Sequence, residues 1–174
     1  VLDGRIYHGH TGAAGEGGHM SIDYRGPFCG CGKRGCIEAL AAGPAIGGRA
    51  RAKLEAERTS AILDLAKGNV TAVTSELVGQ AYVAGDALAR EVLLETVELL
   101  TAWLGNIVDL LDPDVLVMGG GVAAMLNPFF EEIKSRLPGR CVNPSASDIP
   151  LLMAHYGADA GIAGGAALCS DHVS

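Results

Sequence analysis

The feature that most constrains this chain is a cluster of metal-binding residue types between positions 19 and 36. Within eighteen residues, HMSIDYRGPFCGCGKRGC, the sequence places one histidine and three of its five cysteines: His19, Cys29, Cys31 and Cys36. Thiolate sulfur and imidazole nitrogen are the ligands that Zn²⁺ favours in tetrahedral sites. Three cysteines and one histidine fill all four positions, so the pattern predicts a closed, structural zinc site with no place for an activated water.

We call residues 19–38 the cysteine knuckle. Gly30, Gly32 and Gly35 lie between its cysteines, and glycine permits the positive φ that a tight turn around an ion needs. The alternative is a glycine-rich loop of reduced, metal-free cysteines. Three cysteines this close together make a poor disulfide framework, which favours a reducing, cytoplasmic compartment. No role is predicted for Cys141 or Cys169.

The composition indicates one folded domain, and it argues against nucleic-acid binding and against a membrane-spanning helix. The 174 residues are 49% hydrophobic and 19% charged, which is typical of a chain with a sizeable core. The net charge of −7 argues against binding to the phosphate backbone of a nucleic acid. The basic residues are scattered apart from the Arg49–Lys53 cluster, which indicates one polar helix face. No apolar run reaches the length of a membrane helix. The start VLDGRIYHG, without Met, predicts a fragment or the ordered part of a longer protein.

Strand and helix patterns alternate along the chain and predict an α/β domain. Strands are expected at residues 1–7, 20–24, 114–118 and 149–154, and helices at 38–42, 44–57, 59–68, 71–84, 87–111, 127–137 and 161–169. The longest helix carries an apolar stripe that should face the core: Leu88, Val92, Leu99, Trp103, Ile107 and Leu110. The strand at 114–118 is almost wholly apolar, so it is expected to be buried on both faces.

Three short segments together resemble the signature of the ROK family of bacterial sugar kinases and sugar-responsive transcriptional repressors. They are GEGGH at 15–19, CGCG at 29–32 and GCIE at 35–38. The downstream LVMGGGV and GADAGIAGGAAL also resemble the C-terminal half of that family, whereas residues 59–74 match no motif. The resemblance implies an actin-like ATPase (ribonuclease H-like) fold. Residues 1–174 would be its large C-terminal lobe, with a zinc knuckle at 19–38 and the N-terminal lobe absent.

The resemblance also implies that Glu16, His19 and Glu38 contact sugar hydroxyls. Carboxylates commonly accept paired hydrogen bonds from vicinal hydroxyls. If zinc takes one imidazole nitrogen of His19, the other carries a proton and can donate to a hydroxyl. The alternative is that both carboxylates are merely solvated.

A second candidate site is the triple glycine Gly119, Gly120 and Gly121, which follows a buried strand. A glycine turn at the carboxyl end of a strand lets backbone approach a ligand, although a plain tight turn explains the pattern equally well. It is neither a dinucleotide fingerprint nor a Walker loop. The resemblance places this turn against the adenosine of ATP, which would bind with Mg²⁺. Gly157 and Gly161 are expected to let the last helix pack close to the sheet.

Two functions of different class remain open. The first is an ATP-dependent hexose kinase of the glucokinase, fructokinase or N-acetylhexosamine kinase kind. The second is the sugar-sensing domain of a ROK repressor, which would touch DNA only through a preceding helix-turn-helix. A third possibility is a zinc-stabilised scaffold that has lost the ability to bind a sugar. The family's Asp-x-Gly-Gly-Thr phosphate loop and its general base, an Asp after an Asn, do not occur here. The chain is therefore expected to hold no catalytic residue and to be inactive alone, and the long apolar helix predicts homo-oligomerisation.

Overall fold

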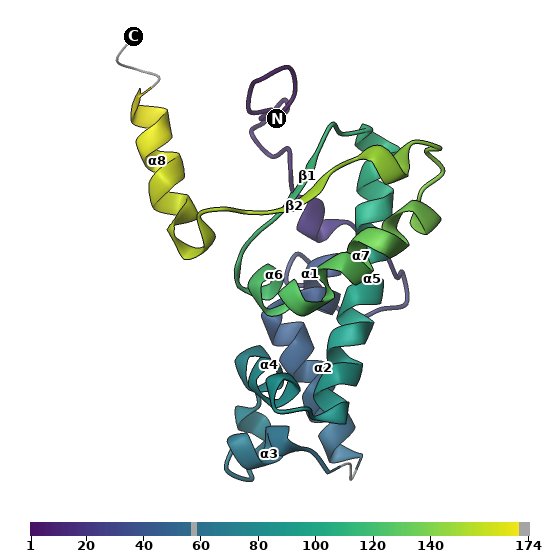
Figure 1. Ribbon diagram of the computed structural model, residues 1–174, viewed down its shortest axis with the longest axis vertical. Coiled ribbons are helices and arrows are strands. Elements are labelled where there is room, and N and C mark those ends of the chain that lie inside the picture. The colour runs from purple at the N-terminus through teal and green to yellow at the C-terminus, as the bar shows by residue number, and fades with distance from the viewer. Residues whose placement is uncertain (57–58, 171–174) are drawn as a thin grey trace.

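A computed structural model describes residues 1–56 and 59–170. The body is mainly helical and lies against one long helix (Figure 1). The α-helices are α1 (Ile37–Ala41), α2 (Gly43–Glu55), α3 (Ala61–Leu65), α4 (Ser75–Val83), α5 (Ala87–Leu111), α6 (Gly121–Met125), α7 (Phe130–Arg136) and α8 (Ala160–Ser170). Short 3₁₀ turns connect them: η1 (Gly17–His19), η2 (Val70–Ala72), η3 (Asn127–Phe129), η4 (Leu137–Arg140), η5 (Ala146–Asp148) and η6 (Gly157–Asp159).

Most predicted helices are confirmed within a few residues. The predicted end of the second helix, Glu57, lies outside the described residues. The helix expected over 127–137 is instead α7 between the 3₁₀ turns η3 and η4, with a proline in the first turn of each 3₁₀ segment. Proline lacks an N–H and prevents one continuous ladder. Residues 59–74, which matched no motif, form α3 and η2 and place Ile62 and Val73 in the core.

The sheet consists of two parallel strands, β1 (Leu116–Met118) and β2 (Leu151–Met153), in register Leu116 to Leu151. Both strands were predicted, but the expectation that residues 114–118 are buried on both faces was wrong. Leu116 and Leu151 are buried, whereas Val117 is 61% and Leu152 51% exposed. Only one face of this small sheet packs on the core, so the alternate side chains meet solvent.

The two strands expected nearer the start of the chain are not strands in the structure. Residues 1–7 contain one isolated bridge between Leu2 and Arg5, and residues 20–24 contain one from Ser21 to Cys36. Asp3 and Gly4 both have positive φ, 48° and 74°, so the chain turns there instead of extending. The strand predictions for residues 1–7 and 20–24 were therefore wrong.

The long helix α5 has defined ends. The Asp86 carboxylate accepts hydrogen bonds from the backbone N–H of Ala89 at 2.7 Å and of Ala61 at 2.8 Å, so one side chain caps α5 and ties α3 to it. Burial acts to raise the pKa of Asp86, but these N–H donors outweigh it and the pKa is lowered. At the other end Asp112 adopts a left-handed conformation, φ 42°, and stops the helix.

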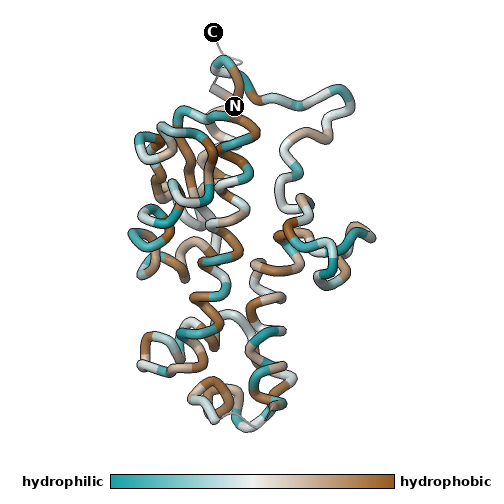
Figure 2. The backbone as a smooth tube through the Cα atoms, turned by 90° about the vertical axis from the view of Figure 1, so that its right-hand side faces the viewer, coloured by the Kyte–Doolittle hydropathy of each residue, from teal (hydrophilic) through white to brown (hydrophobic). Residues whose placement is uncertain are grey.

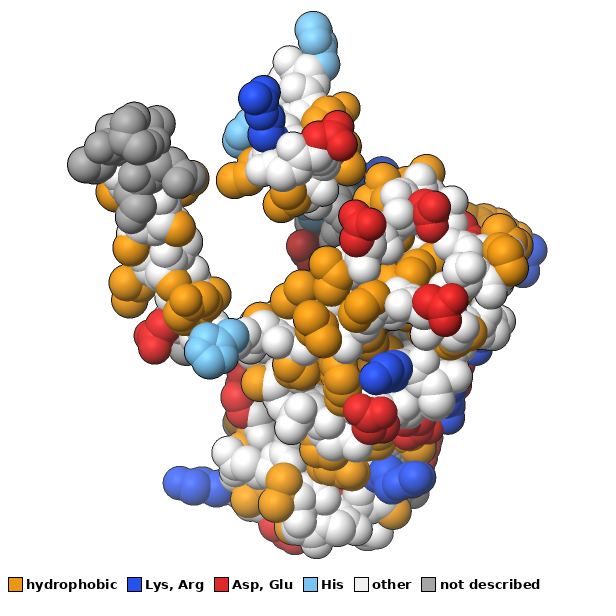
Figure 3. Space-filling model, turned by 45° about the horizontal axis from the view of Figure 1, so that its top comes forward, with side chains coloured by type: hydrophobic (Ala, Val, Ile, Leu, Met, Phe, Trp, Pro, Cys, Tyr) orange, Lys and Arg blue, Asp and Glu red, His pale blue; other side chains and the backbone are white. Residues whose placement is uncertain are grey.

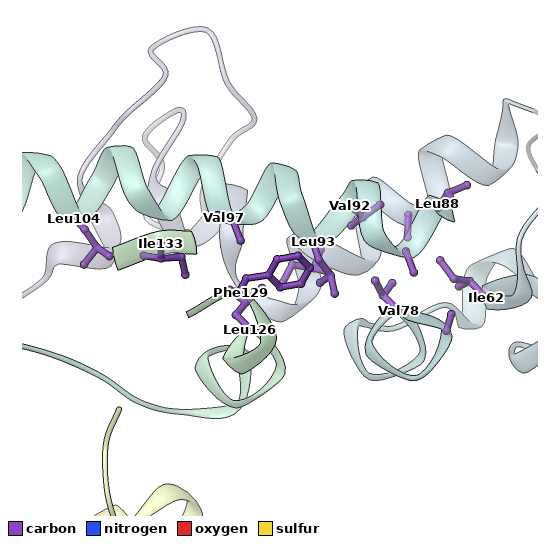
Figure 4. Packing of buried hydrophobic residues seen from close by; sticks show 14 of the residues in the cluster. Ile62, Val78, Leu88, Val92, Leu93, Val97, Leu104, Leu126, Phe129 and Ile133 are labelled. Atoms are coloured by element: carbon purple, nitrogen blue, oxygen red, sulfur yellow. The ribbon is translucent and has the colours of Figure 1, made fainter. Parts of the chain in front are cut away.

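The core forms where α5 meets α2, α4 and the η3–α7 segment, with α3 packed on α4. Figure 4 shows side chains of α5 pointing toward Ile62, Val78, Phe129 and Ile133. The buried residues of α5 include Leu88, Val92, Leu93, Val97, Leu104 and Val108. Figure 2 shows hydrophobic residues distributed along the whole helix. The core of the domain is therefore built on α5.

The predicted stripe of α5 is only partly correct. Leu88 and Val92 are buried, but Leu110 is 69% exposed. Trp103 and Ile107 are half-buried, and they pack at the edge of the core as well as against η1. A single 3.6-residue period cannot distinguish a helix that packs on two sides from one with a single broad face.

The last helix stands away from the body, beside the projecting N-terminal segment (Figures 1 and 3). Ile162 is 76% and Leu168 56% exposed. The expectation that Gly157 and Gly161 allow close packing on the sheet was wrong, because a Cβ at either position would meet nothing within 4 Å. Across residues 1–56 and 59–170, no helix combines the length and apolar character needed to cross a bilayer.

Candidate metal centre and sugar site

The cysteine knuckle folds through short-range backbone hydrogen bonds. The N–H of Cys29 donates to the Lys33 carbonyl at 2.8 Å, and the N–H of Gly35 donates to the Pro27 carbonyl at 2.8 Å. These bonds turn the chain back so that Cys36 returns beside Cys29. Gly35 has φ +64°, and a Cβ there would lie 1.6 Å from the Asp23 carbonyl oxygen. Only glycine fits that position.

The four predicted metal ligands converge on one point. Their ligand atoms all lie within 4.8 Å of one another. His19 Nδ1 is 3.6 Å from Cys29 Sγ, and the sulfurs of Cys31 and Cys36 are 3.6 Å apart. A Zn–S bond of about 2.3 Å puts two sulfurs of a regular tetrahedron about 3.8 Å apart. The spacing and the donor set therefore both fit a tetrahedral zinc ion.

The thiols differ in environment. Cys29 and Cys36 are buried, whereas Cys31 is exposed. Burial raises the pKa of Cys36 to about 11, and the neighbouring Cys31 and Cys29 add to the rise. The backbone N–H of Lys33 lowers the pKa of Cys31. Three thiols this close would repel one another as thiolates, and a bound cation is what stabilises that charge.

The turn η1 positions two of the three predicted sugar contacts. The His19 N–H donates to the Glu16 carbonyl at 3.0 Å, which places both side chains on one turn. His19 directs Nδ1 to the cysteine sulfurs, and its Nε2 lies 3.8 Å from Glu16 Oε2. That separation is too long for a direct hydrogen bond. The Glu16 side chain is 71% exposed and the His19 side chain 29%, so both can reach a solute.

Glu38 reaches the same place from helix α1. It is the second residue of α1, two positions after the predicted ligand Cys36, and it is exposed. Its Oε1 lies 3.7 Å from Cys29 Sγ, and Oε2 would lie 3.7 Å from a Cβ on Gly18. The structure therefore brings Glu16, His19 and Glu38 together around the predicted metal ligands, although they span 23 positions of sequence.

Helix α1 is held by a residue that the sequence placed on a polar helix face. Arg49 of α2 donates to the Leu40 carbonyl of α1 and to the Thr96 hydroxyl of α5, and it forms a 3.4 Å ion pair with Glu95. Burial lowers the pKa of Arg49, while Glu95 opposes that effect. One guanidinium thus joins three helices behind Glu38. Nothing in the sequence pattern distinguishes Arg49 from a solvated arginine, because its partners are remote.

The triple glycine lies at the carboxyl end of β1, as predicted. Gly120 has φ +88° and precedes α6, and Gly119 lies where a Cβ would be 3.0 Å from the Cβ of Ala154. Only Gly121 of the three borders the neighbouring cavity, which has a volume of about 850 Å³ and lies between α4 and α6. Its walls combine apolar and polar groups, among them Ser75, Glu76, Gly79, Gln80, Tyr82, Val122, Met125 and Asn127. A volume of this size suits a small ligand.

The α4 wall of this cavity escaped the sequence analysis. Residues 71–84 were expected only as a helix, and no motif marks Gly79 or Gln80. A glycine inside a helical pattern was the one available signal, since it often indicates close approach of another group. Here Gly79 faces Met125, whose Sδ lies 3.2 Å from where a Cβ would be.

Comparison with known sequences gives consistent matches. The ROK family model matches residues 1–172. The N-acetylmannosamine kinase of Vibrio cholerae is 33% identical over 166 residues, covering 95% of this chain and 51% of that protein. A glucokinase of Halalkalibacterium halodurans is 33% identical over 167 residues, covering 95% and 50%. The chain spans about half the length of the curated relatives it matches.

Solved structures of ROK family proteins also match this chain. A ROK family glucokinase from Streptomyces griseus, in complex with glucose and AMPPNP, superposes with a TM-score of 0.78 at 30% identity. That match covers 94% of this chain and 54% of the glucokinase. A ROK family transcriptional regulator, homologous to the E. coli MLC protein, superposes with a TM-score of 0.73 at 28% identity, covering 88% and 37%. Structural relatives thus include both an enzyme and a regulator.

Proposed function

This chain belongs to the ROK family, and on that premise we propose that the protein carrying it is an ATP-dependent hexose kinase whose sugar is held by Glu16, His19 and Glu38. The observation that carries the proposal is the convergence of these three side chains on one exposed place beside the metal ligands. Matches to an N-acetylmannosamine kinase and a glucokinase support the reaction class.

Each sugar contact has a separate chemical task. The carboxylates of Glu16 and Glu38 accept hydrogen bonds from ring hydroxyls. Nε2 of His19 donates to a hydroxyl, because Nδ1 is directed to the cysteine sulfurs. A zinc ion bound by His19, Cys29, Cys31 and Cys36 would supply a rigid structural anchor. The closed ligand set gives it no position for substrate.

The cavity between α4 and α6 is the proposed place for the adenosine of ATP. Gly119, Gly120 and Gly121 form the turn at its edge, with Gly121 in the wall. Gly120 has a positive φ, which favours glycine, and because the three glycines carry no side chains the backbone of the turn can approach a ligand. Mg²⁺ would accompany the phosphates, as phosphoryl transfer requires.

A Gly79→Leu substitution should weaken ATP binding selectively. The new side chain would meet Met125 in the cavity wall, 3.2 Å from the Cβ position, and take up space there. We expect the KM for ATP to rise roughly tenfold, which corresponds to about 1.4 kcal/mol of binding free energy. Ala84→Leu, which adds three carbons instead of four at an exposed position after α4, is the control. Steady-state kinetics on the protein carrying this chain gives both KM values. An equal rise in the KM for sugar, or none for ATP, would contradict the proposed location.

Catalysis needs groups beyond those of this chain. A kinase of this kind uses a carboxylate to accept the proton of the attacking hydroxyl and a loop that grips the phosphates. The 174 residues contain no Asp-x-Gly-Gly-Thr loop, and Asn106 and Asp109 lie on α5 without matching the general-base motif. We therefore assign binding roles to this chain and no catalytic residue. Homo-oligomerisation stays a prediction.

The second candidate is a sugar-responsive repressor domain. The similarity to a ROK family transcriptional regulator favours it specifically. In that case the same three residues would bind sugar, and the consequence would be a change in DNA affinity through a separate domain. The metal centre serves both functions equally, so it does not discriminate between them.

One experiment separates the candidates. The protein carrying this chain is incubated with ATP, Mg²⁺ and in turn glucose, fructose, N-acetylglucosamine and N-acetylmannosamine, and ADP release is measured. A kinase gives turnover with at least one sugar, and the isolated 174 residues give none. If calorimetry detects sugar binding but no ADP is released, the result contradicts the kinase and supports the regulator. No binding heat from any sugar would refute both and leave a zinc-stabilised scaffold.

A further inference from the structure

The chain's only tryptophan contacts the turn that carries two proposed sugar ligands. The Trp103 indole Nε1–H, on helix α5, donates to the Gly17 carbonyl at 3.0 Å across 86 positions of sequence. The sequence pattern had assigned Trp103 only to an apolar stripe. Its ring is half-buried and packs at the edge of the core, where it also meets the η1 turn.

The contact is tight as well as polar. A Cβ on Gly17 would lie 3.2 Å from Cζ2 of the Trp103 ring and 4.0 Å from Cδ1 of Ile107. The indole therefore lies directly against the glycine backbone. Gly17 is the residue between Glu16 and Gly18, at the start of η1.

This turn has little of its own to hold it. Three of the five residues 15–19 are glycine, and glycine loses more conformational freedom on ordering than any other residue. Gly15 has φ +90°. The local hydrogen bonds, from the His19 N–H to Glu16 and from the Met20 N–H to Gly17, close the turn. At its end the Met20 carbonyl accepts from the Ile37 N–H of α1 at 3.0 Å. Trp103 adds the attachment of Gly17, at the start of the turn, to α5.

We propose that Trp103 is a positioning residue of the sugar site: its indole N–H and ring fix the η1 turn so that Glu16 and His19 face the same sugar. This inference rests on the proposed function. Glu16 Oε2 and His19 Nε2 are 3.8 Å apart, so a small rotation of the turn alters the hydroxyl geometry that the pair can satisfy. A pre-ordered turn removes an ordering cost that the sugar would otherwise bear.

The test compares Trp103→Phe with Ile107→Val in the protein carrying this chain. Phenylalanine keeps an aromatic ring but cannot donate, whereas valine trims the other contact with Gly17 and keeps the indole hydrogen bond. Loss of one hydrogen bond predicts sugar binding weaker by roughly three- to tenfold in Trp103→Phe. The KM for ATP, kcat and one zinc per chain should stay unchanged. Ile107→Val should bind sugar as the parent does.

The outcomes distinguish this inference from the proposed function. If the parent binds no sugar, the proposed function fails and the inference with it. If the parent binds sugar and Trp103→Phe binds it equally well, the inference alone is refuted. A parallel rise in the KM for ATP, or loss of zinc, would show a general structural role and also refute it.

A second variant covers the case in which Trp103→Phe does not fold. Gly17→Ala leaves the helix intact and places a methyl group 3.2 Å from the ring, which pushes the turn away from it. Selective loss of sugar affinity in Gly17→Ala supports the inference, and unchanged affinity refutes it.

Discussion

A Cys31→Ser variant should lose its metal and melt at a lower temperature. A structural zinc site contributes directly to folding, because the unfolded chain does not hold the ion. Loss of about 3 kcal/mol would lower the melting temperature by roughly 6–12 °C in a chain of this size. Metal analysis of the purified protein and calorimetric melting measure the two effects.

The loss should be concentrated in the knuckle. Cys31 is an exposed ligand, so its replacement creates no cavity and the effect reports the metal itself. Cys141→Ser is the matched control, because its Sγ lies 3.2 Å from the Leu137 carbonyl, an acceptor that a serine hydroxyl can also use. Cys141→Ser should keep its zinc and its melting temperature. A parent protein without metal, or an unchanged melting temperature in Cys31→Ser, would rule the site out.

A Glu38→Gln variant should bind sugar far more weakly than the parent. Glutamine has the same size, but it carries no charge and replaces one acceptor oxygen by a donor. Hydrogen bonds to a charged group contribute about 1.5–3 kcal/mol, so the affinity should fall by roughly 10- to 150-fold. Calorimetric titration with the sugar that the parent binds gives the ratio of dissociation constants.

Zinc content provides the internal check on Glu38. Its Oε1 lies 3.7 Å from Cys29 Sγ, so the carboxylate could serve the metal instead of the sugar. The prediction is full zinc content with weakened sugar binding. Zinc loss with intact sugar affinity would reassign Glu38 to the metal centre. Glu131→Gln, an exposed substitution on α7, controls for the change in net charge.

The convergence of the histidine and the three cysteines was predictable because its determinants are local. All four ligands lie within eighteen residues, and the glycines that turn the chain lie between them. Gly35 illustrates the point: its positive φ and its approach to Asp23 depend only on the knuckle's own backbone. Helix α5 was predictable for the same reason, since its capping residue Asp86 and its stop after Leu111 are next to it in sequence.

The prediction failed where the outcome depended on which elements pack together. Leu110 has the spacing of a core residue but is 69% exposed, and the glycines of the last segment do not pack on the sheet. Val117 belongs to an apolar strand, yet one face of that strand meets solvent. Periodicity reports which side of an element is apolar, and it does not say whether a partner covers that side.

The sequence by itself therefore determined the cluster of metal-binding residue types and the helices with local caps, and it located the residues that family resemblance assigns to sugar. Only the tertiary structure decided what supports them. The Trp103 contact with Gly17 and the Arg49 contacts behind α1 join segments far apart in the chain. So does the cavity between α4 and α6. Short-range conformational preferences encode the features that the sequence determined. The supporting contacts and the cavity exist only once long-range packing has brought remote residues together.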